Sequence, residues 1–304
     1  MEWIKNLLLF LLLGLFALSL LLFPTESAQA ARQGLSLCLE TVLPSLFPFF
    51  VLSSLCISTG AAAAFGRALE PVMRPLFGLS GAGAGALALG LTGGYPVGAR
   101  SVAELYRDGA LSRQEAERLL AFCNNAGPGF VMGICGGAVF HSTRAGLYLY
   151  LTHVAAAVLT GILLRRKQPL RLRTAEQRKR NPAPRRLAAA FPAAVRDSFA
   201  AAWSVCGYVV IFAVLLRFAT AALPGAALLP GLLELTNAVL SLTPDRQGFV
   251  ACAVLLGWGG LSVHAQTLSV LEDSGLSANT YFLGKITQAA LSAPLALLFS
   301  LRLD

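Results

Sequence analysis

The stretch that decides the fold reads Gly81-Ala-Gly-Ala-Gly-Ala-Leu-Ala-Leu-Gly90 and continues Leu91-Thr-Gly-Gly-Tyr-Pro-Val-Gly-Ala-Arg100. Its first half consists of small and apolar residues, which let membrane helices pack closely. Its second half places Gly-Gly-Tyr-Pro before a charged residue, and this break should interrupt a helix at membrane depth. Such breaks are tolerated only where protein or a water-filled cavity surrounds them. The stretch therefore predicts a discontinuous helix inside a larger membrane bundle.

The rest of the chain agrees with a membrane protein. Of 304 residues, 56% are hydrophobic and 13% are charged, with a mean hydropathy of +0.68. A soluble domain is about a quarter charged, so a soluble enzyme is disfavoured, and the hydrophobicity excludes a disordered chain. Long apolar runs recur from the N-terminus to the C-terminus. We predict an all-α, polytopic membrane helix bundle of roughly seven to nine membrane-embedded helices, some discontinuous or re-entrant.

The positive charge is concentrated in one short segment. The net charge is +9, and ten of the 24 basic residues lie between Arg165 and Arg186, where Glu176 is the only acidic one. A basic excess of this kind can indicate a nucleic-acid partner. Here it lies in a hydrophilic loop between apolar segments, which favours the positive-inside rule. We predict a cytoplasmic loop at 165–187, in contact with anionic lipid, and no nucleic-acid partner.

The N-terminus has two interpretations. Asn6–Phe23 is an uninterrupted apolar run preceded by Lys5, just long enough to span a membrane. A secretory signal peptide is the alternative, because Ala28-Gln29-Ala30 resembles a cleavage site. The run is long for a signal-peptide core and the downstream sequence is also membrane-like. We therefore predict a retained transmembrane helix over residues 1–24.

The two halves of the chain resemble each other. Gly93–Gly109 aligns with Gly259–Gly275 without a gap and with six identical positions. A Leu-Glu pair precedes each break, and Thr152-His153 resembles Thr287-Gln288. Matching interrupted segments in two halves are the best sequence indication of a transporter's binding site. We predict repeats at 25–164 and 188–304; whether they are parallel or inverted depends on the number of spans.

The first candidate site is the Gly-Tyr-Pro break. A helix that restarts there offers free backbone N–H groups at a positively polarised end, which can bind an anion, and Arg100 adds a fixed cation. The alternative is a packing kink with Arg100 extending to the interface. Charged residues beside membrane breaks are usually functional. We predict a substrate-binding segment made of Gly94, Tyr95, Pro96, Gly98 and Arg100.

Two further segments complete the predicted substrate site. Cys123-Asn-Asn-Ala-Gly-Pro-Gly129 is a second break, where adjacent amides are costly unless hydrogen-bonded; an ordinary external loop is the alternative. The repeat mate of the first break contains a histidine, which can titrate near neutral pH, although a lone histidine is more often a hydrogen-bonded structural residue. The residues added to the site are Asn124, Asn125, Gly127, Ser262, His264 and Gln266.

An acidic residue interrupts another apolar segment. Glu234, with Asn237 three residues later, lies in Leu232-Leu-Glu-Leu-Thr236. A carboxylate at membrane depth is a candidate site for a coupling proton or cation. The alternative is a structural charge paired with Arg217 or Arg100. We predict Glu234 and Asn237 as the coupling site.

Motifs for catalysis and metal binding are absent from the sequence. It contains no P-loop, no Gly-x-Ser-x-Gly and no His-Glu-x-x-His. The six cysteines are scattered in apolar sequence and form no zinc or disulfide pattern. We therefore predict a protein that is not an enzyme and binds neither cofactor nor metal. The sequence leaves the oligomeric state open, a homo-oligomer included.

Four motifs together carry a resemblance to a known family. Leu46-Phe-Pro-Phe-Phe50, Gly94-Tyr-Pro-Val-Gly-Ala-Arg100, Cys123-Asn-Asn-Ala-Gly-Pro128 and Leu232-Leu-Glu-Leu-Thr236 resemble the YlbJ (SpoVV) family of sporulation integral membrane proteins. That family belongs to the nucleoside-recognition, or Gate, group, so both repeats are expected to be Gate-like. The pairing of Gly-Tyr-Pro with Asn-Asn-Ala-Gly-Pro at this spacing is the specific part. The resemblance covers about residues 30–301.

The resemblance implies a function in endospore formation. It points to transport of dipicolinic acid from the mother cell across the outer forespore membrane. Dipicolinate is a flat aromatic dicarboxylate, which suits helix N-termini, a guanidinium and amide donors. Arg100 with the Gly94–Gly98 backbone would hold one carboxylate, and Asn124 and Asn125 would line the same cavity. The alternatives are a permease for nucleosides or another small metabolite, a membrane scaffold without transport activity, and, least favoured, an intramembrane enzyme.

Overall fold

The computed structural model describes residues 2–165, 185–223, 225 and 229–301. The described residues form helices joined by short turns, and no strand occurs among them. The N-terminal helices are α1 (Glu2–Leu22), α2 (Pro24–Leu37), a π-helical turn η1 (Cys38–Val42) and α3 (Leu43–Ser58). The predicted all-α membrane bundle with discontinuous helices is confirmed.

The first half continues through seven helical segments. They are α4 (Ala61–Ala68), α5 (Glu70–Phe77), α6 (Ala82–Gly93), α7 (Val97–Arg107), α8 (Arg113–Cys123), the π-helical segment η2 (Gly129–Val139) and α9 (Thr143–Leu163). The second half contains α11 (Leu187–Ala222), α12 (Leu229–Leu233), α13 (Leu235–Leu240), α14 (Arg246–Trp258), α15 (Gly260–Leu271), the 3-10 turn η3 (Glu272–Ser274) and α16 (Asn279–Ser300).

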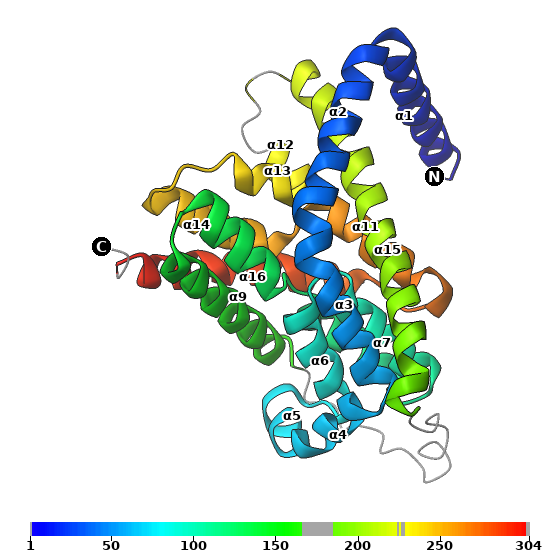
Figure 1. Cartoon of the computed structure of the whole chain (residues 1–304), viewed down its shortest axis with the longest axis vertical. Helices are drawn as coiled ribbons and strands as arrows, with labels where there is room; N and C mark the ends of the chain where they lie inside the picture. The colour runs from blue at the N-terminus through cyan, green and yellow to red at the C-terminus, as the bar shows by residue number, and fades with distance from the viewer. Residues whose placement is uncertain (1, 166–184, 224, 226–228, 302–304) are drawn as a thin grey trace.

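Helices distant in sequence pack side by side. The long helix α11 lies along α2 and α3, and α16 packs against α14, α9 and α8 (Figure 1). The helix α1 turns back beside α2 at the opposite end of the molecule from α4 and α5 (Figure 1). The first and second halves are therefore interleaved, because α16 of the second half packs against α9 and α8 of the first half and α11 packs against α2 and α3.

Four helical stretches are long and apolar enough to span a membrane. They are Thr143–Leu163, Leu187–Ala222, Arg246–Ser274 and Asn279–Ser300. Two bent pairs raise the number to six if each is one span: Leu13–Leu22 with Pro24–Val42, bent by 103°, and Glu70–Phe77 with Ala82–Gly93, bent by 87°. The described part of the chain also has two shorter apolar helices, Leu46–Ser58 and Gly129–Val139.

The Gly-Tyr-Pro break and its repeat mate in the second half have similar backbone φ angles at aligned glycines. Gly94 and its aligned mate Gly260 have φ angles of 78° and 81°, and Gly109 and its mate Gly275 have φ angles of 65° and 66°. These values lie in the left-handed region that glycine enters without steric cost. In each half a helix therefore ends, restarts within a few residues and ends again at a second glycine. The division of the whole chain into two repeats stays a prediction.

Several element boundaries differ from the sequence-based expectation. The segments Leu187–Phe199 and Ala200–Leu216 form one helix, α11, since no glycine or proline separates them. The expected helix Ala61–Phe77 is divided into α4 and α5, because Pro71 lies in the first turn of α5, where proline is tolerated. The segment Ala221–Leu242 is interrupted at Glu234, which begins α13. The basic segment predicted at 165–187 lies mostly outside the described residues.

The end of α8 is inserted between α6 and α7. A Cβ atom added at Gly90 or at Gly98 would overlap the carbonyl oxygen of Cys123. Only glycine at both positions lets the three helices approach this closely, as small residues do in membrane helix packing. This contact fixes where α8 ends and hence where Asn124 and Asn125 lie.

We expect Gly98→Ala to destabilise the bundle, because the added methyl group would displace the end of α8. The free energy of unfolding should fall by about 1–3 kcal/mol, the usual cost of overpacking. Gly207→Ala is the matched control, since an added Cβ there meets nothing within 4 Å. Thermal unfolding in detergent should show a lower midpoint for Gly98→Ala only. Equal midpoints for the two variants would contradict the inserted arrangement of α8.

Candidate functional site

Asn124 joins three helices at the end of α8. Its side chain is fully buried. The Oδ1 atom accepts a hydrogen bond from the backbone N–H of Ala99 at 3.3 Å, and Nδ2 donates to Oγ1 of Thr267 at 2.8 Å. Its backbone carbonyl accepts from Nζ of Lys285 at 2.8 Å. One residue thus connects α7, α15 and α16, with the amide at the N-terminus of α7 paired by the Asn124 side chain.

Asn125 makes a second set of hydrogen bonds, to α16 and to the end of α8. Its Oδ1 atom accepts from Nε2 of Gln288 at 2.9 Å, and its Nδ2 donates to the carbonyl of Phe122 at 2.8 Å. The next backbone N–H, of Ala126, donates to Nε2 of His153 at 3.0 Å. The second break is therefore buried among other helices and hydrogen-bonded on both sides.

His264 belongs to the same network. Its Nδ1 atom lies 2.7 Å from the hydroxyl of Tyr281, which also accepts from Oγ1 of Thr267 at 3.3 Å. Its ring packs edge-on against Trp258 with ring centroids 4.4 Å apart. We call the connected side chains the polar centre: Asn124, Asn125, His153, His264, Thr267, Tyr281, Lys285 and Gln288.

Lys285 is the cation of the polar centre. Its side chain is 1% exposed, and Nζ lies 5.4 Å from the centroid of the Tyr95 ring. Among the described residues no carboxylate forms an ion pair with it. An uncompensated charge inside a membrane bundle is costly and is usually functional. The site therefore has a buried lysine side chain that no carboxylate of the described residues pairs.

Several buried polar atoms of the polar centre and of the segments that carry it have no hydrogen-bond partner among the described residues. They are Nδ1 of His153, Nε2 of His264, Oε1 of Gln288, Oγ of Ser262 and Oγ1 of Thr152. Buried polar atoms are normally paired. The described residues therefore leave part of the hydrogen-bonding capacity of this region unused.

The sequence-based prediction included Asn124, Asn125 and His264 but missed Lys285. The signal was present, because Lys285 is the only charged residue in the apolar run Tyr281–Leu301. Tyr281, Lys285, Gln288 and Ser292 follow helical spacing and form one buried polar stripe of α16. A search for charges inside each span would have found it.

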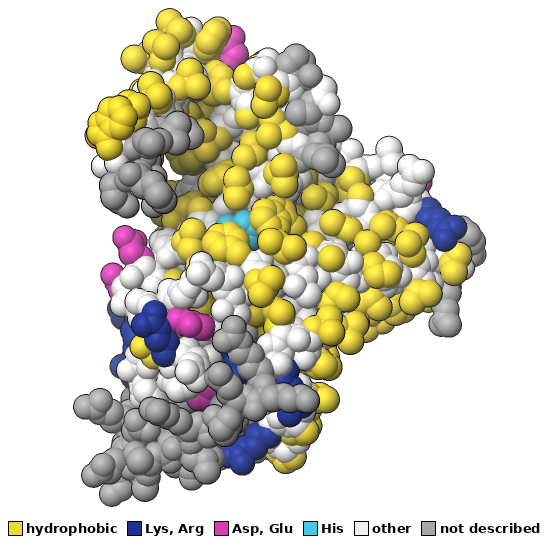
Figure 2. Space-filling model, turned by 180° about the vertical axis from the view of Figure 1, so that it is seen from behind, with side chains coloured by type: hydrophobic (Ala, Val, Ile, Leu, Met, Phe, Trp, Pro, Cys, Tyr) yellow, Lys and Arg dark blue, Asp and Glu magenta, His cyan; other side chains and the backbone are white. Residues whose placement is uncertain are grey.

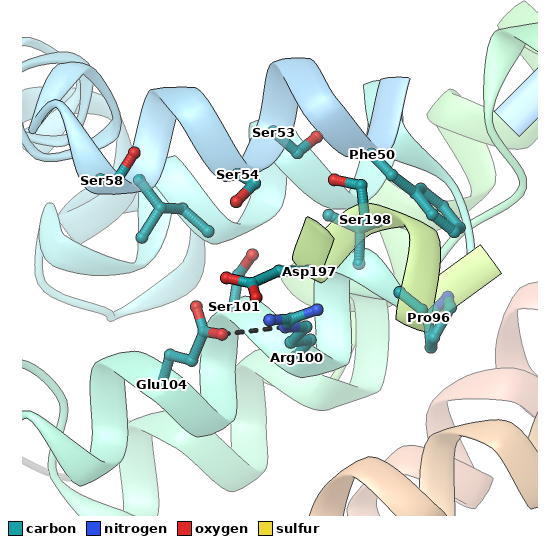
Figure 3. Close-up of a pocket in the computed structure, with 13 residues that line it drawn as sticks. Phe50, Ser53, Ser54, Ser58, Pro96, Arg100, Ser101, Glu104, Asp197 and Ser198 are labelled. Carbon is teal, nitrogen blue, oxygen red and sulfur yellow. Dashed lines mark hydrogen bonds and ion pairs between the residues drawn. The ribbon is translucent and has the colours of Figure 1, made fainter. Parts of the chain in front are cut away.

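Arg100 lies in a separate pocket of about 170 Å³ between α3, α7 and α11 (Figure 3). Its Nε atom is 2.9 Å from Oε1 of Glu104, and the two side chains are 39% and 30% exposed. Neither Asn124 nor Asn125 lines this pocket. The sequence analysis expected Arg100, Asn124 and Asn125 to line one cavity, whereas the structure places Arg100 apart from the two asparagines. Neighbouring residues on a helix face different directions: Ala99 donates to Asn124, whereas Arg100 faces α3 and α11.

The remaining predicted residues are placed as follows. The hydroxyl of Tyr95 donates to the carbonyl of Leu256 at 2.9 Å, so the Gly-Tyr-Pro break contacts α14, the helix that precedes its repeat mate. Pro96 lines the Arg100 pocket. Gly94 and Gly127 lie against each other, since a Cβ added at Gly94 would be 3.1 Å from the Gly127 nitrogen. Gln266 is buried on α15.

Glu234 caps a helix. Its carboxylate accepts hydrogen bonds from the backbone N–H groups of Thr236 and Asn237 at 3.0 and 2.7 Å, and from Nδ2 of Asn237 at 2.8 Å. In the described part of the chain it forms no ion pair with Arg217 or Arg100, which pairs with Glu104. The geometry is that of an N-cap residue, with every carboxylate contact local to α13.

Comparison with known proteins shows to which family the chain belongs. A model of the nucleoside-recognition (Gate) family matches residues 39–164. The chain is 31% identical, over 90% of its length and 78% of the relative's, to the sporulation integral membrane protein YlbJ of Bacillus subtilis (strain 168). The chain belongs to the YlbJ family. No solved structure matches it. The Gate match includes both asparagines and His153 but ends before Lys285, so the polar centre combines residues inside and outside the matched region.

The family membership and the apolar helices together establish a multi-pass membrane protein. The resemblance found in the sequence is thereby confirmed. The region that the Gate model matches contains both the Gly-Tyr-Pro segment and the Asn-Asn segment, and Asn124 and Asn125 of the second segment belong to the polar centre.

We expect Glu234→Ala to lower the free energy of unfolding by about 1–3 kcal/mol, because buried donors of α13 would lose their acceptor. Glu234→Gln keeps one acceptor oxygen and should lose less. Glu272→Ala, at an exposed carboxylate, serves as the control. Chemical unfolding in detergent measures all three variants. A Glu234→Ala protein as stable as the wild type would remove the capping role and favour the coupling role instead.

Proposed function

We propose that this membrane protein transports a small organic anion, and that Lys285 supplies the positive charge that holds it. The observation that carries the proposal is the buried ammonium without a described carboxylate partner. An ion buried at membrane depth needs a counter-charge. A substrate carboxylate at Lys285 would provide it and would also pair the free donors nearby.

The surrounding groups suit an aromatic carboxylate. Lys285 uses one hydrogen bond, to the carbonyl of Asn124, and an ammonium has three donors. The ring of Tyr95 lies beside the ammonium and offers a flat apolar surface. The imidazoles of His153 and His264 each have one ring nitrogen without a partner among the described residues, and these nitrogens can donate to a ligand. These features support a ligand that is flat at one side and anionic at the other.

Dipicolinate is the substrate that we propose. The relative is named as a sporulation membrane protein, and the motifs that resemble its family imply transport of this dicarboxylate during endospore formation. The chain offers two basic side chains near the Gly-Tyr-Pro break, Lys285 of α16 in the polar centre and Arg100 of α7 in its pocket. With the basic segment in the cytoplasm, transport would run from the mother cell across the outer forespore membrane.

A nucleoside permease is the second candidate function. The family model that matches residues 39–164 is described as nucleoside recognition. Amides, imidazoles and an aromatic ring would also bind a neutral base and ribose. The two candidates differ in the role of Lys285, since a neutral substrate does not need its charge.

Uptake of labelled dipicolinate into proteoliposomes tests the proposal. We expect saturable uptake by the wild type and a fall in kcat/KM by about ten- to a hundredfold in Lys285→Met, the usual effect of losing a charged hydrogen bond. Lys285→Arg keeps the charge and should retain part of the activity. The methionine variant should fold, because replacing a buried ion by an apolar side chain of similar volume is often neutral.

Arg144→Met is the control, since Arg144 is exposed and contacts Tyr148 at the surface. Unlabelled dicarboxylates should compete with uptake and nucleosides should not. Wild-type activity in Lys285→Met would refute the anion site. Competition by nucleosides with an unchanged Lys285→Met protein would favour the nucleoside permease, and correctly inserted protein that transports neither class would favour a scaffold.

A further inference from the structure

Two buried ring nitrogens lie side by side where α14 ends and α15 begins. They are Nε1 of Trp258, the last residue of α14, and Nε2 of His264 on α15, and neither has a hydrogen-bond partner among the described residues. The two rings are in edge-on contact, with centroids 4.4 Å apart and planes at 77°. An edge-on contact directs at most one of the two N–H groups at the face of the other ring. At least one of the two nitrogens therefore stays unpaired.

Both nitrogens are hydrogen-bond donors. An indole nitrogen can only donate. The Tyr281 hydroxyl accepts from Oγ1 of Thr267 and lies 2.7 Å from Nδ1 of His264, so its own proton is directed at Nδ1. Nε2 then carries a proton whether the imidazole is neutral or charged. The pair requires an acceptor, and the two oxygens of one carboxylate can accept from both donors.

The donor pair lies in the apolar body of the molecule. Figure 2 shows a largely hydrophobic surface with charged side chains gathered toward its edges, as expected for a bundle that lies in a membrane. His264 is 2% exposed, and its ring also packs on the ring of Phe282 with centroids 5.1 Å apart. Bulk water is absent from the bilayer core, so an unpaired donor there costs free energy. A ligand that supplies an acceptor would remove that cost.

Two contacts connect the donor pair to the ammonium of Lys285. On α16, Tyr281 precedes Lys285 by four residues, so the side chain that contacts the imidazole and the ammonium lie on one face of the helix. At the Gly-Tyr-Pro break, the Tyr95 ring has its centroid 5.4 Å from Nζ of Lys285, and its hydroxyl donates to a carbonyl of α14 two residues before Trp258. The Tyr95 side chain therefore reaches from the ammonium to the end of α14 that carries the indole.

The charges around the donor pair favour an anion. Glu234 packs on this break with its backbone, since a Cβ added at Gly260 would be 3.5 Å from the Glu234 nitrogen. Its carboxylate accepts three hydrogen bonds at the start of α13. The negative charge of Glu234 is thus committed to another helix, whereas the positive charge of Lys285 has no described carboxylate partner.

We propose that Trp258 and His264 form a second pole of the substrate site, which holds the second carboxylate of a dicarboxylate whose first carboxylate lies at Lys285. The inference rests on the proposed anion transport. The two residues then determine selectivity, because a dicarboxylate is held at both poles and a monocarboxylate with the same ring is held only at Lys285. Both poles are buried, so loading requires the surrounding helices to separate, as alternating access provides.

Competition between two matched ligands tests the second pole. Uptake of labelled dipicolinate into proteoliposomes, well below KM, is inhibited by unlabelled dipicolinate or by pyridine-2-carboxylate, which has the same ring and one carboxylate. For the wild type, the dicarboxylate should inhibit at a concentration lower by about tenfold or more, the usual effect of hydrogen bonds to a charged group. In Trp258→Phe, which removes the N–H and keeps an aromatic ring, the inhibitory concentration should rise about tenfold for the dicarboxylate only.

Trp203→Phe is the matched control, because Trp203 is 57% exposed on α11 and stacks on Phe199. It should leave both inhibitory concentrations at their wild-type values. His264→Asn is the second test, since the shorter amide can replace Nδ1 facing Tyr281 while the Nε2 donor is lost. It should act as Trp258→Phe does, and it decides the outcome if that variant does not fold. Lys285→Met should instead weaken both ligands, because each places a carboxylate there.

The outcomes separate the two proposals. No uptake of any anion by correctly inserted wild type would refute the proposed function. Wild-type uptake inhibited equally by both ligands would refute the second pole alone, and so would an unchanged ratio of the two inhibitory concentrations in both Trp258→Phe and His264→Asn. A parallel rise for both ligands in these variants would also refute it, since the two residues would then support the fold rather than hold the second carboxylate.

Discussion

The arrangement depends on the end of α8, where the carbonyl of Asn124 accepts a hydrogen bond from the buried ammonium of Lys285. The chain reaches this point only because Gly90 and Gly98 leave room for the preceding carbonyl between α6 and α7. From there the Asn124 side chain satisfies the start of α7 and contacts Thr267 of α15. A single residue thus holds both broken helices against the last span.

This contact also explains why the two predicted breaks are not two independent sites. An N-terminus of a broken helix attracts anions because its N–H groups lack partners. In α7 the backbone N–H of Ala99 donates to the side-chain amide oxygen of Asn124. This N–H group is therefore already paired, and the positive charges near α7 lie on side chains instead. The positive charge available to a ligand comes from Lys285 on one side of α7 and Arg100 on the other.

The two cations have opposite surroundings. Lys285 is surrounded by neutral amides, imidazoles and an aromatic ring, whereas Arg100 lies between Glu104 and Asp197. A buried cation without a carboxylate partner favours an anion more strongly than a cation that already has one.

The sequence by itself determined the membrane bundle, the positions of both breaks and the family, because hydropathy, glycine and proline act locally. It also identified Asn124, Asn125 and His264 as residues of interest. Only the tertiary structure decided that Arg100 and the asparagines face different cavities, that Glu234 caps α13, and that Lys285 lies at the centre. The separate cavities and the place of Lys285 depend on which face of a helix meets a segment distant in sequence, as with Lys285 and Asn124, whereas the capping by Glu234 depends on where the chain breaks before α13. No local pattern encodes that choice; packing between the two halves makes it.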